Sequence, residues 1–303
     1  MRIGISSTAI VVLLAGSAAV MLAQWPKYPT GAPKTPDGKA NLTAPTPRTK
    51  DDKPDFSGLW NLARAPGRGG GGGGGVGGGA AGGGQAGGRG KQAPPPPTPS
   101  VSPDDPPIGQ FFNIGAGFKD GLLPFTPWAS ALRAQRKADN NKDNPDALCL
   151  PIGLTQFHMH PQPRKIIQTD KVIIMLYEAQ AGIRQIFMDG RALPPKDAEP
   201  WWYGYSVGHW DGDTLVVETT GFRDDVWLDV EGSPLTNTGK MTERMRRLNY
   251  GTMQTDITIE DPKAYTKPFT VRVNHTLLPD EDLIEFVCEE RDSIHYVGKD
   301  GKK

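Results

Sequence analysis

The stretch that decides the fold is residues 201–222, which read WWYGYSVGHWDGDTLVVETTGF. Two runs of strand-forming residues flank Asp211-Gly212, and an Asp-Gly pair in that setting is typical of a tight hairpin turn. Successive side chains of a strand point to opposite faces, so Tyr205 and His209 share one face of the first run. We predict an antiparallel hairpin at the centre of a β-domain.

Further strand-like runs lie on both sides of this hairpin, at residues 165–169, 172–179, 183–189, 240–249, 252–260, 268–277 and 283–289. They predict an all-β fold, an antiparallel up-and-down meander of about eight to ten strands that closes into a barrel and so leaves no free edge. One helix is expected over residues 127–138, because Thr126 is a good N-cap and Pro127 suits the first turn.

The N-terminal residues 1–23 have the pattern of a secretory signal peptide. Arg2 precedes an apolar run that is too short to span a bilayer comfortably, and cleavage is expected near Ala23. An uncleaved anchor is the alternative. We therefore expect a periplasmic or extracellular bacterial protein with no integral membrane span after cleavage, since no later stretch is long and apolar enough.

The rest of the chain divides by composition. Residues 24–53 are polar and predict a disordered lead-in, and residues 54–62 the first strand of the barrel. A glycine- and proline-rich insert, 63–110, predicts a second disordered region. Residues 111–148 are expected to form a helical segment and 149–299 the barrel domain. The first strand can join the barrel across the insert, because the entropy cost of closing a loop rises slowly with its length.

Charge and cysteine content limit the partners and the chemistry. The 34 basic and 34 acidic residues balance, and no basic block indicates a nucleic-acid partner. Cys149 and Cys288 form either a disulfide or two separately buried thiols, and the sequence leaves both open.

Gly58-Leu59-Trp60 at the start of the first strand resembles the motif that opens lipocalin and calycin-like barrels. That resemblance implies a tryptophan ring that closes one barrel end beneath an arginine from the last strand, and Arg291 is the candidate for this arginine.

The chain also resembles an uncharacterised family of secreted bacterial proteins over residues 54–60 and 149–299. The resemblance is carried by CLP at 149–151, QIFMDGR at 185–191, SVGHWDGDTLVV at 206–217 and TER at 242–244. It implies membership but no catalytic role.

Two histidines suggest a metal site. In an extended segment, His158 and His160 would lie on the same face, and with His209 or His275 they would form a three-ligand site for zinc or copper. The simpler interpretation is that both are turn residues bonded to their neighbours.

Acid–base chemistry is a further possibility. His275 lies on an apolar strand face, where a core histidine is common, but a histidine that lines a cavity can bind or catalyse. His209 and Glu218 complete a candidate acid–base set. A structural bridge between Glu218 and an arginine is the alternative.

These features lead to three hypotheses. The first is an exported binding protein that holds a small apolar or aromatic ligand in its barrel, without a cofactor. The second is a barrel hydratase, isomerase or hydrolase that uses His209, Glu218 and His275, and the third is a structural module of the envelope. The ligand's identity and the oligomeric state stay open. The residues expected to contact the ligand are Trp60, Tyr177, Trp202, Tyr205, Trp210 and Arg244.

Overall fold

The computed structural model describes residues 31–63, 102, 104–284, 286 and 288. None of the helices in this part of the chain is long and apolar enough to cross a membrane. The expected signal peptide and most of the glycine-rich insert lie outside the described residues.

The strands are β1 (Gly58–Leu62), β2 (Arg164–Gln168), β3 (Val172–Tyr177), β4 (Ile183–Phe187), β5 (Tyr205–Asp211), β6 (Thr214–Thr220), β7 (Val226–Trp227), β8 (Pro234–Leu235), β9 (Lys240–Asn249), β10 (Thr252–Glu260) and β11 (Phe269–Leu277). The helices are α2 (Pro127–Ala138) and α3 (Leu154–Met159), with short 3-10 turns η2 (Lys119–Gly121), η3 (Pro145–Leu148) and η4 (Ala179–Ala181).

Nine of these strands close into one barrel in the order β1-β11-β10-β9-β6-β5-β4-β3-β2, so the predicted all-β barrel is confirmed. The central hairpin forms as expected, with β5 paired to β6 from Tyr205 to Asp211. Its turn lies one residue later than predicted. Gly212 is the first central residue and has a φ of 59°, an arrangement typical of a type II′ turn rather than type I′.

The meander is interrupted at one place, where β4 and β5 run parallel. They are paired only at Ile186–Ser206 and Phe187–Val207. Parallel neighbours need a long connection that returns the chain to the same end, and the proline-rich segment 188–204 supplies it. The barrel wall therefore has a weakly joined seam between β4 and β5.

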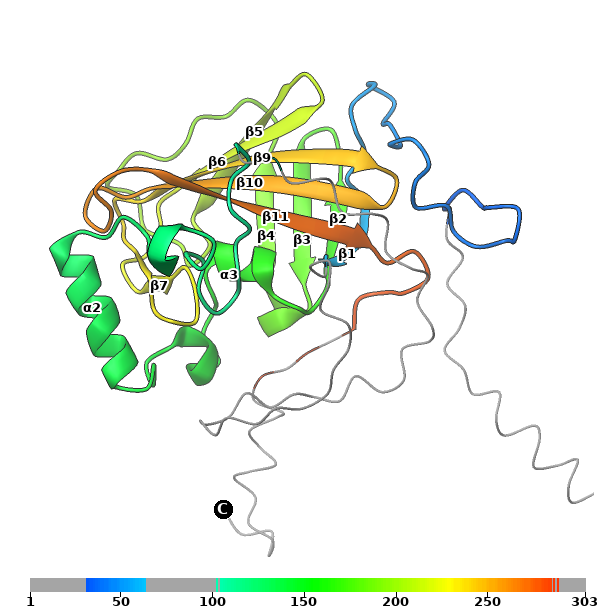
Figure 1. The fold of residues 1–303 in the computed structure, drawn as a ribbon. Coiled ribbons are helices and arrows are strands. Elements are labelled where there is room, and N and C mark those ends of the chain that lie inside the picture. The colour runs from blue at the N-terminus through cyan, green and yellow to red at the C-terminus, as the bar shows by residue number, and fades with distance from the viewer. Residues whose placement is uncertain (1–30, 64–101, 103, 285, 287, 289–303) are drawn as a thin grey trace, which may run out of the picture.

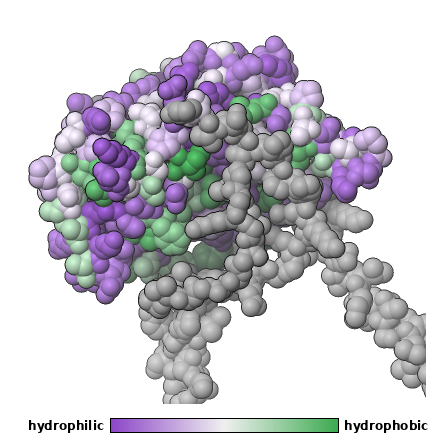
Figure 2. All heavy atoms as spheres, in the orientation of Figure 1, coloured by the Kyte–Doolittle hydropathy of each residue, from purple (hydrophilic) through white to green (hydrophobic). Residues whose placement is uncertain are grey.

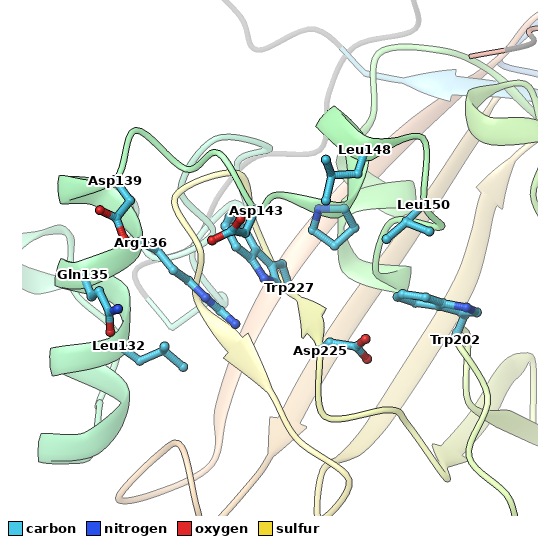
Figure 3. A pocket seen from close by; sticks show the side chains of 11 residues that line it. Leu132, Gln135, Arg136, Asp139, Asp143, Leu148, Leu150, Trp202, Asp225 and Trp227 are labelled. Carbon is cyan, nitrogen blue, oxygen red and sulfur yellow. The ribbon is translucent and has the colours of Figure 1, made fainter. Parts of the chain in front are cut away.

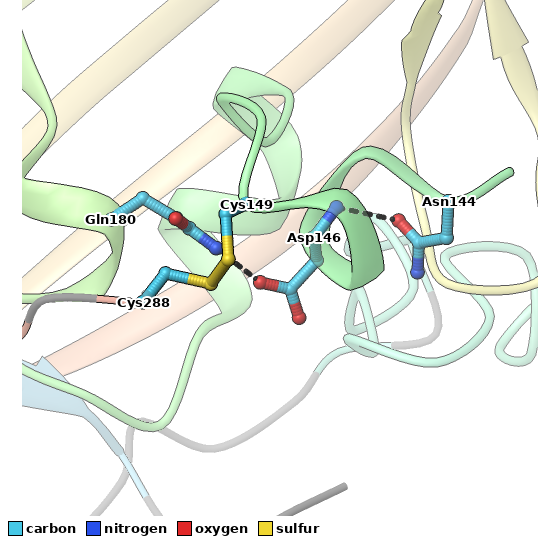
Figure 4. Close-up of a disulfide and its surroundings, with 5 residues drawn as sticks. All are labelled: Asn144, Asp146, Cys149, Gln180 and Cys288. Carbon is cyan, nitrogen blue, oxygen red and sulfur yellow. Dashed lines mark hydrogen bonds between the residues drawn. A yellow bond between two sulfur atoms is a disulfide. The ribbon is translucent and has the colours of Figure 1, made fainter. Parts of the chain in front are cut away.

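The closing strand pair differs from the predicted one. Residues 283–289 were expected to form the last strand, but the described residues among them form none, and β11 pairs with β1 instead. The strand before the glycine-rich insert thus completes the barrel. Cys149 and Cys288 form a disulfide, which ties the chain beyond β11 to the segment before α3 (Figure 4).

Residues 31–53 are not a disordered lead-in where the structure describes them. They lie at the barrel end where β9 and β10 are joined, opposite α2 (Figure 1). The backbone N–H of Gly251 donates to the carbonyl of Leu42, and that of Tyr250 to Ala44. This segment packs on the hairpin between β9 and β10, and its Leu42 and Ala44 are buried.

The same end of the barrel is closed by Trp60, as the lipocalin resemblance implied. Its ring is fully buried and its Nε1 donates to the carbonyl of Phe56 at 2.9 Å. An arginine covers the ring, but it comes from β9: the guanidinium of Arg247 lies 4.8 Å from the ring centroid. Arg291 lies outside the described residues.

Helix α3 occupies the other end of the barrel. All six of its residues are buried, and His158 contacts Arg164 of β2, Glu243 of β9 and His275 of β11. Because α3 and a core of methionine and aliphatic side chains fill the interior, the hollow barrel expected from the sequence is replaced by a plugged one.

Candidate functional site

The predicted acid–base residues are not brought together. His209 is exposed on the outer face of β5, and Glu218 lies on the outer face of β6, where it pairs with Lys240. His275 is fully buried inside the barrel. The two strand faces explain the separation, since His275 shares the inward face of β11 with Val271 and Val273, whereas His209 and Glu218 lie on outer faces.

The two histidines of the proposed metal site are also separated. The expected extended segment is helical to Met159, so His158 and His160 do not share a strand face. His158 points into the barrel, whereas His160 packs edge-on against Phe111, with ring centroids 4.9 Å apart. In the part of the chain that the structure describes, no three His, Cys, Asp or Glu side chains are grouped to hold a metal ion.

A buried polar cluster in the barrel connects α3 to the seam. Nε2 of His158 lies 2.7 Å from Oε1 of Glu243 on β9. Arg184 on β4 donates to both carboxylate oxygens of Glu243. Arg184 also donates to the hydroxyls of Ser206 at 3.0 Å and Thr219 at 3.0 Å, on β5 and β6. These contacts hold a charged pair away from water with its hydrogen-bonding capacity largely satisfied.

The pKa values follow from this arrangement. Burial alone would raise the pKa of Glu243, but the charge of Arg184 and the hydrogen bonds from Arg184 and His158 outweigh burial and hold it at about 2. Burial lowers the pKa of His158 despite the neighbouring carboxylate. At neutral pH, therefore, Glu243 is ionised, Arg184 is its charge partner and His158 is a neutral donor.

A second buried contact joins Arg164, His275 and the end of α3. Nη1 of Arg164 lies 2.6 Å from Nε2 of His275 and 3.0 Å from the carbonyl oxygen of His158. The same Nε2 lies 2.9 Å from that carbonyl oxygen. A guanidinium only donates and a carbonyl oxygen only accepts, so the two contacts favour opposite tautomers of the His275 ring. Among the described residues, neither Nδ1 of His275 nor Nδ1 of His158 has a hydrogen-bond partner.

The seam between β4 and β5 opens into an aromatic pocket, which we call the seam pocket. It has a volume of about 450 Å³. Arg184, its one charged lining residue, is already paired with Glu243. The lining residues are Pro151, Ile183, Arg184, Gln185, Phe187, Trp201, Trp202, Tyr203, Gly204, Tyr205 and Ser206.

A second hollow of about 400 Å³ adjoins the seam pocket and shares Trp202 with it (Figure 3). It lies between α2 and the β7 hairpin. Its two tryptophans already carry arginines of the protein: Arg136 lies 4.3 Å from the ring of Trp227, and Arg223 lies 4.4 Å from that of Trp202. Both rings are thus partly occupied, as is Phe187 in the seam pocket, where the guanidinium of Arg191 lies 3.8 Å from the ring centroid.

The six predicted ligand-contacting residues fall into three groups. Trp202 and Tyr205 line the seam pocket. Tyr177 is buried behind it, stacked on Phe157 at 4.1 Å. The remaining three lie elsewhere: Trp60 and Trp210 near the far end of the barrel, and Arg244 on the outer surface in an ion pair with Asp211.

Sequence reasoning missed most of the buried cluster. Glu243 lies two residues from Met241 and Met245 in β9, and Arg184 lies two residues from Ile186 in β4, so each shares the inward face of its strand with apolar residues. This period of two was the available signal. Arg164 and the role of His158 had no comparable signal, because both depend on the unpredicted helix α3.

Comparisons with protein-family models, curated proteins and solved structures find no match for this chain.

Proposed function

We propose that the protein is a small-molecule-binding protein of lipocalin-like type that takes an uncharged aromatic ligand in the seam pocket. The observation that carries this proposal is the convergence of Phe187, Trp201, Trp202, Tyr203 and Tyr205 on one cavity. Aromatic side chains supply large contact areas and preferred ring geometries for such a ligand.

The position of the pocket differs from the usual interior site. The barrel interior is filled by α3 and the core, so a ligand is accommodated in the wall, where β4 and β5 separate. Charge also favours an uncharged ligand, since Arg184 in the lining is paired with Glu243, and Arg191, which contacts Phe187 and Tyr205, is paired with Asp189.

Export is part of the proposal. The N-terminal pattern of a signal peptide supports a periplasmic or extracellular location, as does the resemblance of the sequence to an uncharacterised family of secreted bacterial proteins. The disulfide between Cys149 and Cys288 agrees with an oxidising compartment.

Binding is the better supported of the two chemical hypotheses. An enzyme would need acid–base groups that face the ligand. His158 and Glu243 are within hydrogen-bond reach of each other, but they are fully buried and neither lines the seam pocket.

The test is a titration of the full chain with 2-naphthol, in which isothermal titration calorimetry measures the dissociation constant. Trp201→Ala removes one pocket wall and is expected to weaken binding about tenfold, the loss that corresponds to about 1.4 kcal/mol. Trp128→Ala on α2 is the matched control, because Trp128 is similarly exposed, at 43% against 39% for Trp201, but does not line the pocket. Absence of binding, or equal affinities for both variants, would refute the proposal.

A further inference from the structure

The seam pocket contains a piece of unpaired strand edge. The β4 edge that faces β5 is paired only at Ile186 and Phe187, so residues 183–185 have no strand partner on that side. On the other side, β4 is fully paired to β3, from Ile183 opposite Leu176 to Phe187 opposite Val172. The free edge is thus short and lies within the lining of an aromatic pocket.

The direction of the backbone groups follows from the β3–β4 ladder. Tyr177 N–H donates to the carbonyl of Gly182, and Met188 N–H donates to that of Lys171. In an antiparallel pair, such bonded residues alternate with residues whose N–H and C=O point away from the partner strand. Even-numbered residues of β4 therefore bond to β3, and the N–H and C=O of Ile183 point into the seam.

The edge also lacks the devices that usually protect an exposed strand. Natural edges carry lysine, proline or an inward-pointing charge with a bulge, which prevent another strand from pairing. Ile183 instead presents an apolar side chain that is 60% exposed beside the pocket. The neighbouring Arg184 points inward, but it is neutralised by Glu243 and does not repel an incoming chain.

From these observations we infer that the ligand of the seam pocket is an aromatic residue of an extended peptide, held by the N–H and C=O of Ile183 as an added strand residue. A peptide residue offers an N–H and a C=O on one side, which match those of Ile183, and main-chain pairing with a side-chain pocket is a known mode of peptide recognition. The aromatic ring then lies against Phe187, Trp201 and Tyr205. This inference rests on the proposed function and narrows its ligand to a peptide.

The test uses two matched probes and two matched variants. N-acetyl-L-phenylalanine methylamide carries the required N–H, whereas O-acetyl-L-phenyllactic acid methylamide has an oxygen in its place. Dissociation constants are measured by NMR titration of the full chain. The amide is expected to bind about fivefold more tightly than the ester, the ratio that one hydrogen bond of about 1 kcal/mol provides.

Ile183→Pro removes the N–H that faces the pocket. Proline is tolerated at the first residue of a strand, and Gly182 has φ −67° and ψ 140°, the conformation that a residue before proline prefers. Ile183→Ala is the control, since it loses the side chain but keeps the N–H. The proline variant is expected to bind the amide about fivefold more weakly than the alanine variant. Thermal unfolding of both variants checks that the barrel is intact.

The outcomes separate the two proposals. Equal affinities of amide and ester, or of the proline and alanine variants, would overturn the peptide inference and leave the aromatic pocket standing. If neither probe nor 2-naphthol binds the parent protein, the proposed function fails and this inference with it.

Discussion

Nε2 of His158 lies 2.7 Å from Oε1 of Glu243, and both side chains are closed to solvent inside the barrel. The contact joins the helical plug to the wall, because His158 is on α3 and Glu243 on β9. Arg184 completes the contact from β4, next to the seam pocket. The position of the plug and the floor of the pocket thus depend on one carboxylate.

Glu243→Gln is expected to destabilise the protein by about 3 kcal/mol or more, because it leaves the buried guanidinium of Arg184 without a counter-charge. Urea unfolding, monitored by circular dichroism, measures the change in the free energy of unfolding. Glu260→Gln is the control, since Glu260 is exposed at the end of β10 and its loss is expected to cost less than about 0.5 kcal/mol. Equal stability of the two variants would mean that the ion pair contributes little.

The folded protein should lose stability as the pH falls below about 6.5, and His275 should account for part of that slope. Burial, with the nearby charge of Arg164, lowers the pKa of His275 well below 6.5, so the unfolded chain takes up a proton that the folded protein does not. Stability therefore decreases with acidification until the folded pKa is reached. Glu243 adds a further loss between its unfolded pKa near 4.5 and its folded value of about 2.

His275→Gln removes the imidazole that takes up a proton in the unfolded chain but not in the folded protein. Between pH 6 and 5, its free energy of unfolding should fall less steeply than that of the parent protein, by up to about 1.4 kcal/mol per pH unit. The measurement is a series of urea unfolding curves across this range. His209→Gln replaces an exposed histidine and serves as the control. An identical slope in His275→Gln and the parent would contradict the assignment of a neutral, buried His275.

The strands were predictable because their signal is local. In β9 and in the second half of β10, side chains alternate between the core and the surface, and both strands have the bounds that the sequence indicated. Helix α2 was found for a similar reason, since Thr126 caps it and Pro127 occupies its first turn.

The features that shape the site were not predictable, because they depend on contacts between distant parts of the chain. Helix α3 has only six residues and no side-chain cap, and it is stabilised by burial in the barrel rather than by its own sequence. The parallel pairing at the seam follows from the path of segment 188–204, for which no periodic pattern exists. The sequence indicated Trp202 and Tyr205 as aromatic residues that contact a ligand. It did not indicate the site in the barrel wall that these two residues line.

The disulfide between Cys149 and Cys288 should stabilise the protein, because it closes a loop with a sequence separation of 139 residues. The chain-entropy model gives an upper value of about 5 kcal/mol for a loop of this size. Dithiothreitol is therefore expected to lower the unfolding midpoint of the parent protein. It should also weaken binding of 2-naphthol, since Cys149 is two residues before Pro151 in the pocket wall.

The double variant Cys149→Ser/Cys288→Ser is the control for this experiment. It should unfold at the lower midpoint with or without dithiothreitol. A parent protein whose midpoint does not respond to reduction, under conditions where both thiols are shown to be free, would exclude a stabilising role.

Gly153→Ala tests whether α3 is held in one position by the close approach of its N-cap residue, Gly153, to the backbone of Trp227. A Cβ at Gly153 would lie 2.3 Å from the carbonyl oxygen of Trp227, and a backbone atom cannot move away as a flexible side chain would. The helix must shift, and with it the hydrogen bonds from Thr155 to Leu228 and from Gln156 to Trp227. We expect a loss of about 2 kcal/mol or more in the free energy of unfolding.

Gly31→Ala, where nothing lies within 4 Å, is the matched control and should change stability by less than about 0.5 kcal/mol. If Gly153→Ala were as stable as this control, α3 would be free to adjust, and the plug would not fix the floor of the seam pocket.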